Sequence, residues 1–429
     1  MLSRLDLRAF DADLRVALAR PALADDHQQR RELVAAVIAE VRDRGDAALR
    51  ELTERFDGVR VGDLHVHRDE LQSALDACDP HLVVALEFAR DQILAYHEAQ
   101  REHEARHERM GVQVRELILP VDRAGCYVPG GLAAYPSTVL MTVVAAKVAG
   151  VPSVALCTPP GADGHPPAVT LAAALIAGAD DVYRVGGVQA IAALAYGTES
   201  ILPADVIVGP GNAFVTEAKR QVIGEVGIDA LAGPSELVVV ADGTTDPDLV
   251  AADLLAQAEH GPGGQAIVVS WHESALDAVD EALAAQLAVT VRRAEAEATL
   301  ATGGRAVLVA SPDQAIAVSN AIAPEHLQLM CADPEDLVSL VRHAGAVFVG
   351  PWAPAVIGDY VAGVNHVLPT GAAARFSSAL RVADFQKHVH VVTLDRSALG
   401  RVGPFASTIA DAEGLDAHAR SIRIRESRP

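Results

Sequence analysis

The sequence predicts an α/β protein with two incomplete, Rossmann-like βαβ domains, a helical N-terminal segment and a C-terminal tail. Three observations lead to this prediction. The first hundred or so residues are charged, carry apolar residues at helical spacing and contain no strand-like run. From about Val121, short β-branched runs alternate with alanine-rich amphipathic helices, a pattern that indicates βαβ units on a parallel sheet. From about Ala379 to the end, this alternation is lost.

Seven runs in the alternating region have the composition of buried strands, which is enough for two sheets. The turn signal Gly233-Pro234 separates two strand-helix series and predicts a joint between the sheets. The seven runs are SVALCT, DVYRV, DVIVG, ELVVVA, QAIVVS, RAVLVA and AVFVG.

Length and composition exclude several classes of protein. A chain of 429 residues is too long for one ordinary core and fits two domains with appendages. A formal charge of -22 argues against nucleic-acid binding, which needs a basic surface. The four cysteines are far apart and form no Cys-x-x-Cys pair, which suits reduced thiols. We see no signal peptide and no apolar run of membrane-spanning length, so we expect a cytoplasmic protein without a membrane partner.

Three short motifs match known chemistry but lack their partners. The segment 103–107 has the H-E-x-x-H pattern of zinc peptidases, but charged residues surround it and no third ligand follows, so an exposed helix face is favoured. The loop 260–264 is similar to a lipase oxyanion loop, yet the chain has no G-x-S-x-G nucleophile. The segment 209–214 follows a strand and opens a helix, but the third glycine of the dinucleotide fingerprint is missing. Any NAD site here differs from the standard one.

The segment DPDLVAADLLAQAEHGP predicts a helix with Pro247 in its first turn and Gly261 after its end. Gln257 and His260 then share one face and could reach one metal ion. The alternative is that His260 only complements the partial charge of the helix C-terminus.

Two further segments place acids and bases near the ends of elements. Glu325 and His326 follow Pro324, which ends a helix, and precede an alternating strand. Such a pair also occurs by chance. Asp359 is predicted in a glycine-bounded loop, either binding a ligand or making an Asx turn.

Longer motifs over nearly the whole chain carry a family resemblance: the sequence resembles histidinol dehydrogenases. The matching stretches are YVPGGLAAYPSTVLM, VGGVQAIAALAYGTES, GPGNAFVTEAKRQV, AGPSELVVVAD, DLLAQAEHGP, APEHLQL, GDYVAGVNHVLPT, VADFQK and EGLDAH.

The resemblance implies a role for twelve residues. The implied zinc ligands are Gln257, His260, Asp359 and His418. The implied catalytic pair is Glu325 and His326. Substrate contacts are implied at the four zinc ligands and at Ser235, His326, His366 and Glu413, and NAD contacts at Tyr127, Gln189 and Asn212.

The implied reaction is the NAD-dependent, four-electron oxidation of L-histidinol to L-histidine through bound histidinal, the last steps of histidine biosynthesis. His326 would accept the alcohol proton, and Glu325 would activate the water that adds to the aldehyde. The alternative is a related zinc-dependent dehydrogenase that acts on another alcohol, such as a sulfonated diol.

The resemblance also implies a homodimer in which the tail completes the partner subunit's site. The domains expected are an N-terminal helical arm (1–23), a first α/β domain with the zinc and catalytic residues (24–123 and 235–378), a second with the NAD contacts (124–234), and the tail (379–429).

Overall fold

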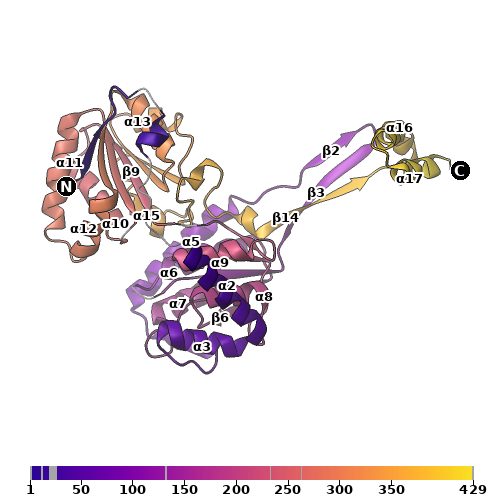
Figure 1. The fold of residues 1–429 in the computed structure, drawn as a ribbon, viewed down its shortest axis with the longest axis horizontal. Helices are drawn as coiled ribbons and strands as arrows, with labels where there is room; N and C mark the ends of the chain where they lie inside the picture. The colour runs from indigo at the N-terminus through magenta and orange to yellow at the C-terminus, as the bar shows by residue number, and fades with distance from the viewer. Residues whose placement is uncertain are drawn as a thin grey trace.

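Three sheets organise the molecule in the computed structural model, which describes residues 2–10, 13–18, 27–130, 133–231, 233–261 and 263–427. Two are parallel sheets, one of six and one of five strands, and each has helices on both faces. The third is an antiparallel ribbon that extends away from both (Figure 1). The predicted α/β class with two parallel sheets is confirmed.

The six-stranded sheet has the order β1-β11-β10-β9-β12-β13. All seven strand runs predicted from composition form strands in this sheet or in the five-stranded one. The strands of the six-stranded sheet are β1 (Ser3–Asp6), β9 (Glu236–Ala241), β10 (Gln265–Ser270), β11 (Gly304–Leu308), β12 (His326–Met330) and β13 (Ala346–Val349).

Alternate residues of β9 and β10 enter the two cores of this sheet. Leu237, Val239 and Val268 pack toward one set of helices, and Val238 and Val240 toward the other. The first set is α10 (Pro247–Ala258), α11 (Glu273–Leu287), α12 (Arg293–Gly303) and α15 (Ala355–Tyr360). The second is α1 (Leu14–Ala17), α13 (Pro312–Ile322) and α14 (Pro334–Val338).

The five-stranded sheet has the order β6-β5-β4-β7-β8 and is also covered on both faces. Its strands are β4 (Arg123–Tyr127), β5 (Ser153–Cys157), β6 (Asp181–Tyr183), β7 (Val206–Val208) and β8 (Gly227–Ile228). One face packs against α4 (Arg68–Asp76), α5 (Pro80–Glu98), α6 (Pro136–Val148) and α7 (Ala168–Ala177). The other packs against α2 (His27–Arg44), α3 (Asp46–Asp57), α8 (Gly187–Tyr196) and α9 (Ala213–Val222).

Two of the predicted domain limits differ from the structure. Helices between residues 27 and 98 pack on the five-stranded sheet, so they do not join 235–378 as expected. The expected helical arm at 1–23 contains strand β1, which pairs with β11, and short helix α1; residues 11–12 and 19–26 lie outside the described ranges. Amphipathic spacing shows that a helix has a face to bury, but it does not identify the sheet that covers this face.

The antiparallel ribbon was not predicted, because β2 is exposed and polar and no residue of its three strands is fully buried. It consists of β2 (Arg106–Arg109), β3 (Val112–Pro120) and β14 (Gln386–Thr393), and it leads to helices α16 (Arg396–Ala412) and α17 (Asp416–Glu426) at its far tip (Figure 1). Two 3₁₀ turns, η1 (Ala373–Arg375) and η2 (Val382–Phe385), precede β14. Helices α16 and α17 are therefore held at a distance from both parallel sheets (Figure 1), whereas Leu380, Val382 and Phe385 of the predicted tail pack in the core of the five-stranded sheet.

The H-E-x-x-H segment lies at the start of this ribbon. His103 follows the end of α5 and His107 lies within β2, so the two histidines do not share a helix face. None of the helices in the described ranges combines the length and the apolar composition that a membrane span requires.

Candidate active site

Glu325 and His326 lie at the amino end of β12, which is the strand next to the edge strand β13 in the six-stranded sheet. Helix α13 ends at Ile322, and Ala323 (φ 53°) turns the chain toward the strand. Both side chains are buried, with 5% and 6% of their surface exposed. The neighbouring strand β9 holds both: the N–H of Glu236 donates to Glu325 Oε2 (2.9 Å), and His326 Nδ1 donates to the carbonyl oxygen of Glu236 (3.2 Å).

Burial and nearby charges set the protonation of this pair. Burial raises the pKa of Glu325 above its ordinary value, against the opposing effect of His326. Burial lowers the pKa of His326, but Asp359 and Glu325 outweigh this effect and raise it overall. His326 Nε2 lies 3.7 Å from Asp359 Oδ1, which is too long for a hydrogen bond, and it has no hydrogen-bond partner among the described atoms. The imidazole therefore directs an available nitrogen toward Asp359.

The predicted metal ligands of the main body come from the ends of two helices. Gln257 is buried in the last turn of α10, and His260 lies just after it. His260 Nδ1 donates to the carbonyl oxygen of Ala256 (3.0 Å), which leaves Nε2 for a ligand. Asp359 belongs to α15, which corrects the predicted loop. Burial raises the pKa of Asp359, but His326, His366 and His260 outweigh it and lower the pKa overall.

The donor atoms of these three residues can bind a zinc ion, but three donors are fewer than the four that a zinc site usually has. An imidazole and a carboxylate are ordinary zinc donors, whereas an amide oxygen is an unusual one. Gln257 Nε2 is buried and has no partner among the described atoms, which indicates an amide placed for a bound group. In the described part of the chain, no cluster of three His, Cys, Asp or Glu residues could hold a metal ion. One chain thus supplies three of the four predicted donors, Gln257, His260 and Asp359. Only His260 and Asp359 are among the residue types His, Cys, Asp and Glu.

His366 connects the two parallel-sheet domains. Its Nδ1 donates to the carbonyl oxygen of Asp359 (3.0 Å), and its Nε2 lies 3.1 Å from the hydroxyl of Thr138 on α6. Burial lowers the pKa of His366, so the neutral ring accepts from Thr138. A direct substrate contact at Nε2 requires Thr138 to release this nitrogen. Ser235, the other predicted contact of the main body, immediately precedes β9 with its hydroxyl beside Glu325.

The predicted NAD contacts lie at the carboxyl edge of the five-stranded sheet. The chain leaves β4 for β5 on one side and returns as β7 on the other, so a topological switch point lies between β4 and β7. Tyr127 ends β4, and Asn212 follows β7. Gln189 lies in the first turn of α8, and the Tyr127 hydroxyl accepts the N–H of Gly187 (3.2 Å) next to it. Burial raises the pKa of Tyr127 to about 12, so its phenol stays protonated.

Asn212 caps the helix that follows the incomplete fingerprint. Its Oδ1 accepts the N–H groups of Phe214 (3.0 Å) and Val215 (3.1 Å) and caps α9. These are the helix N-terminal donors that bind a phosphate in a standard Rossmann site. Because Asn212 occupies them, these two N–H groups are not available to a phosphate.

Glu413 and His418 are far from all of these residues. Both are exposed and lie at the tail helices, at the tip of the ribbon (Figure 1). A single chain therefore does not bring them to the other predicted ligands.

Comparison with known proteins places this arrangement in a family. The family model for histidinol dehydrogenase matches residues 20–426. The chain belongs to the histidinol dehydrogenase family. It is 49% identical over 396 residues to histidinol dehydrogenase of Rhizobium meliloti (strain 1021), covering 92% of this chain and 91% of the relative. It is 47% identical over 421 residues to that of Pseudomonas aeruginosa (97% and 95% covered). The crystal structure of histidinol dehydrogenase from Elizabethkingia anophelis superposes with a TM-score of 0.94 at 34% identity, covering 99% of this chain and 98% of that one.

Membership in the histidinol dehydrogenase family confirms the predicted oxidoreductase class. The structure adds two residues that sequence reasoning missed. Glu236 holds Glu325 and His326 through its backbone, and its Oε1 accepts the N–H of Gly371 (3.1 Å). Thr138 holds His366 across the domains. The sequence signal for both was their position inside the matching stretches AGPSELVVVAD and YVPGGLAAYPSTVLM, and Glu236 also directly follows the predicted Ser235.

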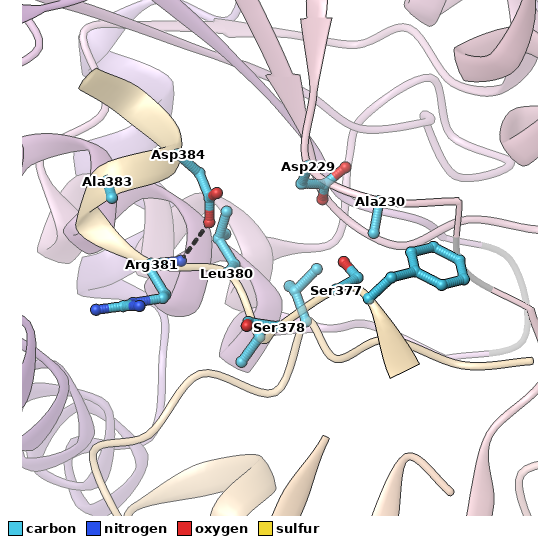
Figure 2. A pocket seen from close by; sticks show the side chains of 11 residues that line it. Asp229, Ala230, Ser377, Ser378, Leu380, Arg381, Ala383 and Asp384 are labelled. Carbon is cyan, nitrogen blue, oxygen red and sulfur yellow. Dashed lines mark hydrogen bonds between the residues drawn. The ribbon is translucent and has the colours of Figure 1, made fainter. Parts of the chain in front are cut away.

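A cavity in the described part of the chain lies elsewhere. It has a volume of about 290 Å³ and is lined by Asp229, Ala230, Val367 and residues 376–381, 383 and 384 (Figure 2). The N–H of Arg381 donates to Asp384 Oδ2 (2.6 Å) at its wall. None of the twelve predicted site residues lines it, so it is separate from the candidate site.

Proposed function

We propose that this chain oxidises L-histidinol to L-histidine in two NAD-dependent steps, with histidinal held between them, as the last steps of histidine biosynthesis. The observation that carries the proposal is the family match over residues 20–426. We also propose a cytoplasmic location, which is consistent with four free cysteines.

In the first step, His326 accepts the proton of the substrate hydroxyl. Its Nδ1–H is committed to the carbonyl oxygen of Glu236, so the basic nitrogen is Nε2, which points away from the sheet toward Asp359. Histidine is the most common general base in proteins, and Asp359 and Glu325 raise the pKa of His326 above its ordinary value, which favours acceptance of the proton.

In the second step, Glu325 removes a proton from the water that adds to the aldehyde. The N–H of Glu236 fixes Glu325 Oε2, and burial raises the pKa of the carboxyl group, which makes it a stronger base than an exposed glutamate. The two bases are neighbours in sequence, with His326 Nδ1 and Glu325 Oε2 3.6 Å apart, so both can reach one bound substrate.

Zinc would be held by Gln257, His260 and Asp359 together with His418 of the partner subunit. Bound zinc supplies a fixed anchor for the substrate's imidazole and amino nitrogens, and NAD accepts the hydride in each step. His366 and Ser235 shape the pocket around this anchor, and Tyr127, Gln189 and Asn212 hold the dinucleotide.

We propose a homodimer because the tail cannot reach its own site and cannot bury its own apolar surface. Val392, Phe405 and Ile409 of the ribbon and tail helices are 58%, 67% and 60% exposed. Exposed apolar side chains in this number mark an interface. A two-fold dimer would cover them and bring Glu413 and His418 to two equivalent sites.

An assay of NADH formation tests the activity. The purified chain is incubated with NAD and either L-histidinol or a panel of other alcohols, including a sulfonated diol. We expect two NADH per histidinol and no comparable rate with the other alcohols. Absence of activity with histidinol, or a faster rate with another alcohol, would refute the proposed substrate.

Metal analysis tests the zinc ligands separately. We expect His260→Ala and His418→Ala each to lose bound zinc while the far-ultraviolet circular dichroism of the chain is unchanged. His103→Ala, in the H-E-x-x-H segment, is the matched control and should keep its zinc. Full zinc content in both ligand variants would overturn the assignment.

A further inference from the structure

Helix α9 carries a lysine where its apolar stripe predicts a hydrophobic residue. The inward face of α9 consists of Val215, Ala218, Lys219 and Val222, at the spacing of one buried helix stripe. Only 2% of the surface of Lys219 is exposed. A lysine is almost never this buried unless it is paired.

The partner of Lys219 is Asp229, and the pair encloses the backbone of one glycine. Lys219 Nζ forms an ion pair with Asp229 Oδ1, and each of these side chains is 3% exposed. Nζ also donates to the carbonyl oxygen of Gly209 (2.9 Å), while the N–H of Gly209 donates to Asp229 Oδ2 (2.7 Å). Both backbone polar groups of Gly209 are therefore bound by one buried ion pair.

Gly209 begins the turn that links the predicted NAD contacts. It has φ 118°, and a Cβ atom at this position would lie 2.1 Å from the carbonyl oxygen of Tyr127. Three residues later, Asn212 caps α9. The turn is thus fixed at its start by the ion pair and at its end by the cap, and it lies directly against the end of β4.

Global stability does not require this arrangement. A buried ion pair and a well-packed apolar pair of similar volume contribute comparably to the free energy of unfolding, because desolvation offsets the attraction between the charges. An apolar pair, however, could not hold the N–H and the carbonyl of Gly209 at the same time. The specific effect of the ion pair between Lys219 and Asp229 is therefore to fix the position of the turn.

We propose that Lys219 and Asp229 are positioning residues for the dinucleotide: they fix Gly209 so that Tyr127 and Asn212 face one cofactor across the switch point. The inference rests on the proposed function only in taking NAD as the cofactor. Neither side chain needs to touch NAD, since both act through the backbone of Gly209.

The test compares the NADH affinity of two double variants. Affinity is measured by fluorescence titration of the purified full-length chains. Lys219→Met alone leaves the Asp229 carboxylate buried without its counter-charge and threatens folding. Lys219→Met/Asp229→Asn removes both charges; the amide at 229 can still accept from the N–H of Gly209, but the carbonyl loses its donor. We expect this variant to bind NADH about ten-fold more weakly, as a small displacement of binding groups does. Its KM for NAD should rise equally, with the KM for histidinol and the zinc content unchanged.

Arg123→Met/Asp181→Asn is the matched control. It removes an ion pair (2.8 Å) from the opposite, amino edge of the same sheet, where the Arg123 side chain is 9% exposed. This variant should keep its NADH affinity even if it unfolds at lower urea concentration. Unchanged NADH binding in the Lys219 and Asp229 variant, or equal weakening in both variants, would overturn the inference.

The same titration separates this inference from the proposed function. If the unmodified chain binds NADH but does not oxidise histidinol, the proposed substrate is wrong and the comparison of the two variants still decides the inference. If the unmodified chain does not bind NADH, the inference itself is overturned.

Discussion

The two parallel sheets carry the predicted site residues at opposite edges. In the five-stranded sheet, Tyr127 and Asn212 follow the carboxyl ends of β4 and β7, at the switch point where α/β proteins usually bind ligands. In the six-stranded sheet, Glu325 and His326 lie at the amino end of β12, and His260 follows α10, which returns to the same edge. The carboxyl edge of one sheet thus faces the amino edge of the other, and the contact between Thr138 and His366 joins them.

The two regions also differ in completeness. The three predicted NAD contacts come from one domain of one chain. The catalytic region has its bases and three ligand candidates, but Glu413 and His418 remain at the tip of the ribbon (Figure 1). Nucleotide binding is therefore a property we expect of a single chain, and catalysis a property of the assembly. Four predictions test this difference, from the largest expected effect to the smallest.

His326→Ala should abolish catalysis and leave nucleotide binding intact. Loss of a general base costs about 10²–10⁴-fold in kcat, and here both half-reactions should fall, because a proton leaves the substrate in each. The measurements are NADH formation from histidinol and from histidinal, with NADH binding followed by fluorescence. A variant that keeps more than a tenth of the activity would remove His326 from its role as the base.

Mixed subunits should recover activity that neither parent has. His326→Ala and His418→Ala chains are co-expressed with different affinity tags, and the mixed dimers are isolated. If the tail of one chain completes the site of the other, one of the two sites in each mixed dimer is intact and about half of the unmodified activity returns. If His418 serves its own chain, each site keeps one defect. Mixed dimers that remain inactive would refute the shared site.

Glu325→Gln should separate the two oxidation steps. Water activation is needed only after the aldehyde has formed, so oxidation of histidinal should fall by about 10–100-fold, and more than oxidation of histidinol. The rates are compared in single-turnover experiments with each substrate. Equal losses in the two steps would contradict this division between Glu325 and His326.

The smallest expected effect concerns the joint between the regions. His97 on α5 is fully buried; its Nδ1 donates to the carbonyl oxygen of Ile93 (2.8 Å), and its Nε2 lies 3.3 Å from Asn365 Nδ2, next to His366. Burial lowers the pKa of His97, so protonation is disfavoured in the folded state. Its contribution to stability is present above the unfolded-state pKa of about 6.5 and is lost as pH falls below this value through the folded-state pKa.

Urea unfolding at pH 7.5 and at lower pH, with His97→Gln as the comparison, measures this effect. The variant should be about 1 kcal/mol less stable at pH 7.5. The difference should shrink as the pH falls, since only the unmodified chain must protonate a buried imidazole. A difference that stays constant or grows on acidification would contradict the expected neutral state of His97.

Much of the fold was predictable because local patterns determine local structure. Seven buried β-branched runs became strands, and Pro247 and Pro324 lie where a helix begins and where one has ended. The ribbon was not predictable from pattern, since the exposed strand β2 has no apolar face and the pairing of β3 depends on β14, far along the chain. The pairing of β1 with β11, some three hundred residues away, escaped prediction for the same reason.

The candidate site, like the fold, has features that the sequence determined and features that only the structure decided. The sequence by itself determined the family and the identity of the chemical groups, because long motifs such as APEHLQL fix residue types in order. Only the tertiary structure decided that the helices between residues 27 and 98 cover the five-stranded sheet, that the backbone of Glu236 holds Glu325 and His326, and that the tail helices stand apart from the candidate site of their own chain (Figure 1). The apolar periodicity of a segment indicates which face it must bury. Which other segment covers that face depends on packing between parts of the chain that are distant in sequence.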